Sequence, residues 1–247
     1  MPFKSWSQAH YELISTRDQS PSLRKGGNGE VMHHSGGAWA ETREVYGRVI
    51  QPTFDLLPES PPRFLSLGLG LGYIECLIAV TALQQSSLNW KCVSYELDPF
   101  LRNAFRAFIE GSLNQGEVAR TYQRIFELSG EDPERLRLHL QQALQSGRWV
   151  IEGPLRVGML PPFLVNTYLW DAFSQETSPE LWQEDFLNQF LRQSSDPSEW
   201  CRLSSYACVG PLKRALKAQK FLVQTPPGFH GKRNSTMATR AGPTTQP

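Results

Sequence analysis

The fold is decided by the stretch Arg63-Phe64-Leu65-Ser66-Leu67-Gly68-Leu69-Gly70-Leu71-Gly72-Tyr73. Apolar residues over 64–67 are typical of a short buried strand, and glycines follow at three alternate positions. Because glycine has no Cβ, the backbone can turn tightly there and a ligand can approach it closely. An apolar helix expected over 72–83 points its free N–H groups back at this turn. The stretch therefore predicts a cradle for a nucleotide-type cofactor.

The chain around this stretch alternates between strand-like and helix-like segments. Helices are expected over residues 99–109, in two pieces within 117–146, and over 178–192 and 210–219. Strands are expected over residues 90–96, 149–151, 155–157, 163–170, 200–207, 220–224 and 235–239. This alternation predicts an α/β fold with a mostly parallel, Rossmann-like sheet and helices on both faces.

Ligands of such sheets bind beyond the carboxyl ends of the strands. The glycines at 68–72, Glu96 and Asp171 all fall at expected carboxyl ends, so they converge on one crevice. Glu96 can accept hydrogen bonds from both ribose hydroxyls of an adenosine-containing cofactor, or it is an ordinary exposed acid. Asp171 can orient or deprotonate an amine nucleophile, or it is a turn or helix-capping residue.

The expected domain is flanked by two less regular segments. Residues 1–37 form an N-terminal extension with a small hairpin, in which 11–16 and 30–33 pair across a turn at the glycines of 26–29. Residues 38–240 form the Rossmann-like domain, beginning with a helix over 38–50 that Pro52 ends. Residues 241–247 are expected to be a disordered tail.

Composition excludes several classes of protein. The chain has 247 residues, 40% apolar and 20% charged, which suits a soluble α/β protein. It starts without an apolar leader, and the glycines and Glu75 argue against a membrane span over 64–83. The four cysteines show neither C-x-x-C pairing nor zinc-spaced histidines, so we expect no metal site. Buried free thiols suit a reducing compartment, and we expect a cytoplasmic protein.

The charge is segregated along the chain. Eight basic residues and no acidic one follow Glu199, whereas the first 199 residues carry 17 basic and 24 acidic residues. Such segregation has two interpretations, a face for an anionic partner such as nucleic acid or a solvated helix face beside a basic tail.

The glycine spacing bears on the cofactor. A dinucleotide fingerprint is G-x-G-x-x-G, but Tyr73 stands where its third glycine is required. Glycine turns of this kind, followed by an acid after the second strand, point to another adenosine-containing cofactor.

Four blocks of the sequence follow one another in a characteristic order. They are Glu30-Val31-Met32-His33-His34-Ser35-Gly36-Gly37-Ala38-Trp39-Ala40-Glu41-Thr42; Leu67 to Gly72; Trp170-Asp171-Ala172-Phe173-Ser174 with Ser178-Pro179-Glu180-Leu181-Trp182; and Ser205-Tyr206-Ala207 through Gly228-Phe229-His230-Gly231-Lys232-Arg233. In order and approximate spacing over residues 10–240, these blocks resemble the methyltransferase domain of bacterial tRNA 5-methylaminomethyl-2-thiouridine biosynthesis and its stand-alone relatives.

The resemblance implies a class I methyltransferase that uses S-adenosyl-L-methionine and acts on tRNA. By analogy, Asp171 would lie between the sulfonium methyl group and the accepting amine. The residues implied to contact the cofactor are Gly68, Leu69, Gly70 and Gly72 beside its methionine part, Glu96 on its ribose, and Glu41 nearby. Those implied to contact RNA are Lys232 and Arg233 at phosphates, and Phe173 or Trp182 near the inserted base unless these aromatic rings belong to the core.

The sequence also departs from this family. Leu71 and Tyr73 replace a threonine and an asparagine that are usual in the glycine loop. The segment 155–163 is short and lacks the acid that contacts the adenine side in relatives, and the oxidase domain fused in some relatives is absent from this chain. Three functions remain open: a methyltransferase of the aminomethyl group on wobble uridine, a methyltransferase of another amine or small molecule, and a non-catalytic RNA-binding protein on a degenerate methyltransferase fold.

Overall fold

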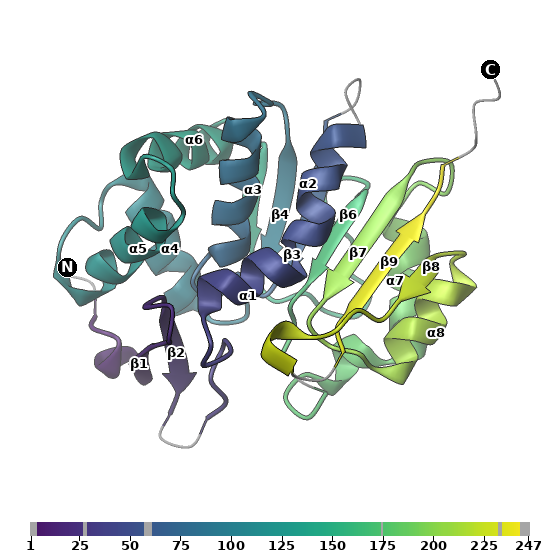
Figure 1. Cartoon of the computed structure of the whole chain (residues 1–247), viewed down its shortest axis with the longest axis horizontal. Helices are drawn as coiled ribbons and strands as arrows, with labels where there is room; N and C mark the ends of the chain where they lie inside the picture. Colours follow the sequence, from purple (N-terminus) through teal and green to yellow (C-terminus); the bar gives the residue numbers. More distant parts are fainter. Residues whose placement is uncertain (1–3, 27–28, 57–60, 174, 232–233, 243–247) are drawn as a thin grey trace.

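The computed structural model describes residues 4–26, 29–56, 61–173, 175–231 and 234–242. Its main sheet has seven strands in the order β5-β4-β3-β6-β7-β9-β8 (Figure 1). Their bounds are β3 (Arg63–Leu67), β4 (Lys91–Tyr95), β5 (Trp149–Glu152), β6 (Thr167–Trp170), β7 (Cys201–Ser205), β8 (Leu222–Gln224) and β9 (Thr236–Arg240). The strands from β5 to β7 are parallel, and β9 runs antiparallel between β7 and β8. The predicted α/β fold with a mostly parallel sheet is confirmed.

Helices cover both faces of this sheet. They are α1 (Ala38–Val45), α2 (Gly47–Leu56), α3 (Tyr73–Gln84), α4 (Pro99–Glu110), α5 (Gly116–Leu128), α6 (Pro133–Gln145), α7 (Glu184–Ser194) and α8 (Gly210–Ala218). Alternate residues of a strand face opposite sides, so Phe64 joins the core under α1 to α6, whereas Leu65 joins the core under α7 and α8. The carboxyl ends of β3, β4 and β6 meet at one edge, beside the N-terminus of α3.

The N-terminal hairpin differs from the prediction. β1 (Tyr11–Ser15) pairs antiparallel with β2 (Pro21–Lys25), so the turn lies over residues 16–20. Asp18 holds this turn by accepting hydrogen bonds from the Thr16 hydroxyl at 2.7 Å and the Ser20 N–H at 3.0 Å. The expected turn at 26–29 is present, since the Gly29 N–H donates to the Gly26 carbonyl at 2.8 Å. The expected pairing of 11–16 with a strand over 30–33 is wrong, because β1 pairs instead with β2 across the turn that Asp18 holds. Within 30–33 the described residues make one bridge, Val31 to Arg24.

The hairpin is packed against the α/β domain. Trp6, which precedes it, is 1% exposed and donates from its indole N–H to the Thr121 hydroxyl on α5 at 2.9 Å. Tyr11 and Leu23 belong to the same core as α4 and α5. The extension therefore has a fixed position relative to the crevice.

Three further segments differ from the sequence-based prediction. The helix expected over 38–50 is divided at Tyr46, and Pro52 lies inside α2 instead of ending a helix. The strand expected over 155–157 is absent from this described segment, where Val157 is exposed and Gly158 has a φ of +87°. The segment 178–192 begins with a 3-10 turn (Pro179–Trp182) before α7. The tail at 243–247 lies outside the described residues.

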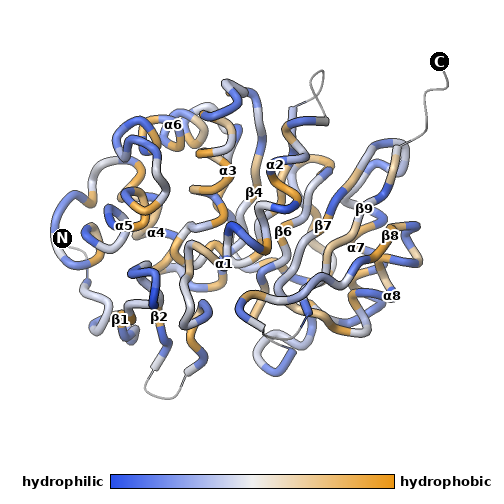
Figure 2. Tube along the Cα trace, viewed as in Figure 1, coloured by the Kyte–Doolittle hydropathy of each residue, from blue (hydrophilic) through white to orange (hydrophobic). Residues whose placement is uncertain are grey.

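Helix α3 runs along the sheet as an apolar element (Figure 2), and it contains one buried acid. Glu75 is 1% exposed and accepts a hydrogen bond from the Ser94 hydroxyl at 2.7 Å. Its second carboxyl oxygen has no hydrogen-bond partner among the described residues. Burial raises the pKa of Glu75 to about 7, because the apolar surroundings disfavour the charged form.

Replacing Glu75 with glutamine should remove a pH-dependent loss of stability. The raised pKa means that the folded protein binds this proton more tightly than the unfolded chain, so stability present at acidic pH is lost as the pH rises through about 7. We expect E75Q to match the wild type in urea unfolding at pH 5 and to exceed it by about 1–3 kcal/mol at pH 8.

The matched control is E110Q, because Glu110 is an exposed residue at the end of α4. It should leave the pH dependence of unfolding unchanged. An E75Q variant that is less stable than the wild type at pH 8 would contradict a buried, destabilising carboxylate.

Candidate cofactor and substrate cleft

The glycine turn is held between β4 and β6. The N–H groups of Gly68 and Leu69 donate to the Tyr95 carbonyl at 2.9 and 3.1 Å. Gly68 has a φ of +92°, and a Cβ there would lie 2.5 Å from the Asp171 carbonyl oxygen. Gly72 has a φ of +77°, and a Cβ there would lie 2.2 Å from the Phe105 ring. Glycine is therefore required at both positions by the packing of the fold itself.

Gly70 has a different environment from its two neighbours. Its φ is +52°, and among the described residues the one atom within 4 Å of a Cβ there would be the Met32 sulfur, at 3.8 Å. Gly70 lines a cleft that opens at the carboxyl edge of the sheet. Its backbone is therefore open to close approach by a ligand, as the sequence predicts for this turn.

Most of the site residues predicted from the sequence line this cleft. Gly68, Leu69 and Gly70 line it together with Glu41 from α1, Glu96 after β4, and Asp171 and Phe173 after β6. Gly72 is not among the lining residues, because it caps α3 and packs on Phe105. Lys232 and Arg233 lie outside the described residues.

Glu96 is held by the backbone. One carboxyl oxygen accepts from the Gly70 N–H at 2.9 Å, and the other accepts from the Asp98 N–H at 2.8 Å. Burial raises the pKa of Glu96, whereas these two backbone hydrogen bonds oppose the rise by favouring the charged form. The carboxylate is therefore oriented in advance, and its remaining lone pairs can accept from hydroxyl groups.

Asp171 meets a tyrosine that sequence reasoning missed. The Tyr46 hydroxyl donates to its carboxylate at 2.5 Å, and the Asp171 N–H donates to the Leu67 carbonyl at 2.9 Å. Burial raises the pKa of Asp171 to about 7, with smaller contributions in the same direction from Glu41, Glu75 and Glu96. Tyr46 gave no signal in the sequence, because a helix was expected to continue through it, whereas it occupies the break between α1 and α2.

The charges of the cleft favour a cationic ligand. Glu30, Glu41, Glu96 and Asp171 line it, and none of its described lining residues is lysine or arginine. Glu41 also accepts from the His34 N–H at 2.7 Å, which ties the loop after the hairpin to α1. Four acids in one partly buried cleft repel each other, and a bound cation relieves that repulsion.

A second cavity adjoins the first and shares Glu41 and Tyr206 with it. Its volume of about 540 Å³ is within the usual range for small-molecule sites. Val45, Trp182 and Phe229 supply apolar wall, and none of its described lining residues is lysine or arginine. Trp182 is 2% exposed and donates to the Phe173 carbonyl at 2.7 Å, so it belongs to the core and also borders this cavity.

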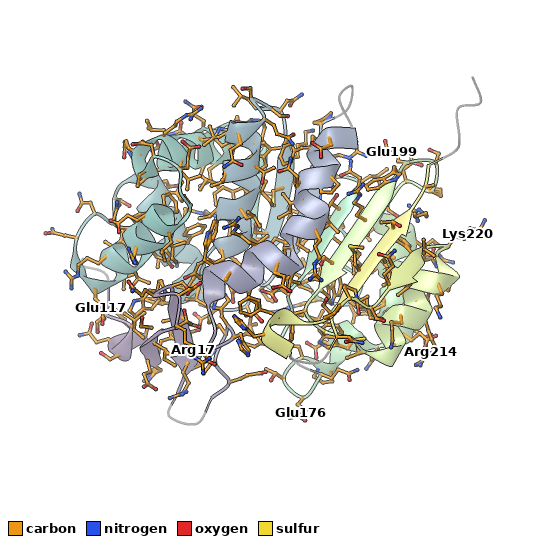
Figure 3. The ribbon with its side chains drawn as sticks, in the orientation of Figure 1. Arg17, Glu117, Glu176, Glu199, Arg214 and Lys220 are labelled. Carbon is orange, nitrogen blue, oxygen red and sulfur yellow. The ribbon has the colours of Figure 1, made fainter. Side chains whose placement is uncertain are left out.

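The basic residues near the C-terminus lie in more than one place, and Lys213, Arg214 and Lys217 share helix α8. Arg202 and Arg240 are buried and stack on Trp200 and Phe221, at 3.6 and 4.9 Å from the ring centroids. Arg214 pairs with Glu184 at 2.6 Å. Figure 3 shows Arg214 and Lys220 beside α8, away from Arg17 and Glu176. For Arg202, Arg214 and Arg240, the charge segregation in the sequence therefore reflects structural roles.

Two absences hold for the part of the chain that the structure describes. It contains no group of three or more His, Cys, Asp or Glu side chains that could hold a metal ion. None of its helices has the length and apolar character needed to cross a bilayer.

Comparisons with known proteins agree with this arrangement. Residues 135–241 match the model of a family described as S-adenosyl-L-methionine-dependent methyltransferase. The chain is 28% identical over 178 residues to the tRNA 5-methylaminomethyl-2-thiouridine biosynthesis bifunctional protein MnmC of Cupriavidus necator, covering 70% of this chain and 25% of that protein. It is 35% identical over 74 residues to MnmC of Acinetobacter baylyi, covering 30% of this chain and 11% of that protein. These matches confirm the family resemblance.

A solved structure supports the fold. The crystal structure of MnmC2 from Aquifex aeolicus superposes with a TM-score of 0.63 at 21% identity, covering 94% of this chain and 71% of that one. The architecture is thus the class I methyltransferase fold. The chain spans only 10% to 25% of the lengths of the curated MnmC relatives.

The residues of the cleft fit S-adenosyl-L-methionine. Gly70 leaves open space beside its backbone, and Glu96 presents an oriented acceptor for hydroxyl groups. The acidic lining complements a ligand that carries both a sulfonium and an ammonium group. This fit agrees with the cofactor that the family resemblance implies.

The two glycines at 70 and 72 should respond differently to alanine. We expect G72A to lose about 2–5 kcal/mol of unfolding free energy, because strain at positive φ adds to a clash with Phe105. G70A should lose only about 1–2 kcal/mol but should weaken binding of S-adenosylhomocysteine at least about tenfold, since its methyl group enters the cleft. Urea unfolding and titration calorimetry measure the two effects. Unchanged affinity in folded G70A would contradict a ligand at this turn.

Proposed function

We propose that this chain is an S-adenosyl-L-methionine-dependent N-methyltransferase whose substrate is the aminomethyl group on the wobble uridine of tRNA. The observation that carries the proposal is the Asp171 carboxylate, which Tyr46 holds in the acid-lined cleft, next to a second cavity that shares Glu41 and Tyr206 with that cleft. A cofactor in the first cavity and a base in the second would meet near Glu41 and Tyr206, and Asp171 lines the cofactor side of this junction. The MnmC proteins to which the chain is similar carry tRNA modification in their names.

The cofactor supplies an electrophilic methyl group on its sulfonium. The protein positions the amine for in-line attack, and the amine must be uncharged when it attacks. Asp171 receives or binds the proton that the amine gives up, and Tyr46 orients the accepting oxygen. The raised pKa of Asp171, about 7, makes its carboxylate a stronger base than an exposed aspartate near neutral pH.

The remaining predicted residues take supporting roles in this proposal. Glu96 binds the ribose hydroxyls, Gly68 to Gly70 pass beside the methionine part, and Glu41 adds negative charge opposite the cation. Phe173 lines the cleft and is available to pack on an inserted base, while Lys232 and Arg233 contact phosphates. We place this chemistry in the cytoplasm, where tRNA is modified, and propose 38–240 as the methyltransferase domain with 1–37 as its extension.

A second candidate is methylation of another primary amine. It is favoured by the second cavity, whose volume of about 540 Å³ and apolar wall from Val45, Trp182 and Phe229 suit a small amine. Both candidates use the same carboxylate, so they differ only in the substrate that enters.

Removing the carboxylate should stop methyl transfer while leaving the fold intact. We expect D171N to lower the rate of transfer about 10²–10⁴-fold, because a positioned general base contributes about that much. Binding of S-adenosylhomocysteine, measured by calorimetry, should change far less than the rate. Wild-type turnover in D171N would contradict the assigned role.

Tyr46 should change the pKa of the Asp171 carboxylate. A hydrogen bond to the ionised carboxylate lowers the pKa of Asp171, so Y46F should raise that pKa by about one to two units. The single-turnover rate of the wild type should rise as the pH rises through about 7, since the carboxylate must be ionised to take up a proton. In Y46F this rise should move to higher pH, with activity partly recovered at alkaline pH. A lower rate with an unmoved profile would mean that Tyr46 has only a structural role.

The substrate is tested in cells. Nucleoside mass spectrometry of tRNA from a strain lacking this chain should show 5-aminomethyl-2-thiouridine accumulating, and the wild-type gene should reverse this change whereas D171N should not. An unchanged nucleoside profile would remove tRNA as the substrate and leave the second candidate.

A further inference from the structure

A third cavity extends the cleft past Glu96. It shares Gly68, Glu96, Ala172 and Phe173 with the first, so the two are continuous. Most of its remaining wall is apolar and comes from Leu97 after β4, Leu155 after β5 and Leu181 in the 3-10 turn Pro179–Trp182. A ligand whose hydroxyls meet Glu96 would therefore place its next group between leucine side chains.

The shape and chemistry of this wall suit a flat ring. Leu155 and Leu181 are 5% and 7% exposed, whereas Leu97 is 61% exposed and has no cover on its outer side. A purine ring between such side chains would bury apolar surface on both faces, including the exposed surface of Leu97. The edge of the ring still needs polar partners, because an amine buried without an acceptor costs free energy.

The loop after β5 offers no carboxylate to such an edge. Residues 153–163 contain no aspartate or glutamate, and Pro154 has no backbone N–H. Its long apolar side chains are directed mostly to solvent, since Val157 and Leu160 are 61% and 48% exposed. The polar partner of the ring edge must therefore come from another wall of the cavity.

Glu180 lies on the facing wall. It lines the same cavity from the turn Pro179–Trp182, and apart from Glu96 it is the one carboxylate among the described lining residues. The turn is anchored by the buried Leu181 and Trp182 and by the bond from the Trp182 indole to the Phe173 carbonyl. The Glu180 carboxylate is exposed and has no hydrogen bond or ion pair with the described residues. An anchored backbone thus presents a free acceptor at the rim.

We propose that Glu180 accepts a hydrogen bond from the exocyclic amine of the cofactor's adenine, a role for which the loop after β5 has no carboxylate. This inference rests on the proposed cofactor. Glu180 would then select adenine over a purine with an oxygen at the same position, because that oxygen accepts hydrogen bonds and would be repelled by a carboxylate.

Calorimetric titration with two ligands tests the proposal. S-adenosylhomocysteine carries the amine, and S-inosylhomocysteine carries an oxygen in its place. We expect the wild type to prefer the adenine compound at least about tenfold, as a hydrogen bond to a charged group implies. In E180A the affinity for S-adenosylhomocysteine should fall about tenfold, and the preference should largely disappear. E180Q should retain part of the preference, since its amide oxygen still accepts.

The matched control is D185A, which removes an exposed acid from the first turn of α7 without touching the cavity. It should bind both ligands as the wild type does. Wild-type affinity and preference in E180A would overturn the role of Glu180 while leaving the proposed function intact. Failure of the wild type to bind S-adenosylhomocysteine at all would overturn the proposed function, and this inference with it.

Discussion

The site depends on the close approach of the glycine turn to the end of β6. Gly68 leaves no room for a Cβ against the Asp171 carbonyl, and its N–H donates to the Tyr95 carbonyl at the end of β4. The Asp171 N–H in turn donates to the Leu67 carbonyl. Backbone contacts alone thus fix where the strand ends meet. Glu96 and Asp171 follow these strand ends, so the positions of the strands in the sheet determine the distance between their carboxylates.

This arrangement brings several acids together in buried positions, where the ionised form of each lowers the stability of the fold. Burial raises the pKa of Glu75 and of Asp171 to about 7, and it raises that of Glu96 as well. Hydrogen bonds favour the ionised form of only some of these groups. Glu96 is one of them, because its carboxylate accepts from two backbone N–H groups. A cationic ligand in the cleft would favour the ionised forms, so binding and proton release are expected to be coupled. The same unfavourable charge that lowers stability thereby contributes to affinity.

The sequence was sufficient for the fold and for the acids that follow strands. Buried parallel strands such as 64–67 read as apolar runs, and residues just after them are placed by the sheet topology. Tyr46 was missed because its role depends on a break between two helices that local pattern does not reveal. The pairing of the hairpin was mispredicted because the segment contains two turns, and the one that Asp18 holds at 16–20 gave a weaker sequence signal than the glycines at 26–29. The strand expected at 155–157 failed because an apolar run does not tell whether its side chains are buried.

The reaction we propose is the transfer of a methyl group, in the acid-lined cleft, to an amine on tRNA. The most direct measurement incubates the purified chain with S-adenosyl-L-methionine carrying a deuterated methyl group and with tRNA bearing 5-aminomethyl-2-thiouridine, and then analyses the nucleosides by mass spectrometry. We expect 5-methylaminomethyl-2-thiouridine with the deuterated methyl group on its amine nitrogen. Recovery of the unmodified aminomethyl nucleoside, from protein that binds the cofactor, would contradict it.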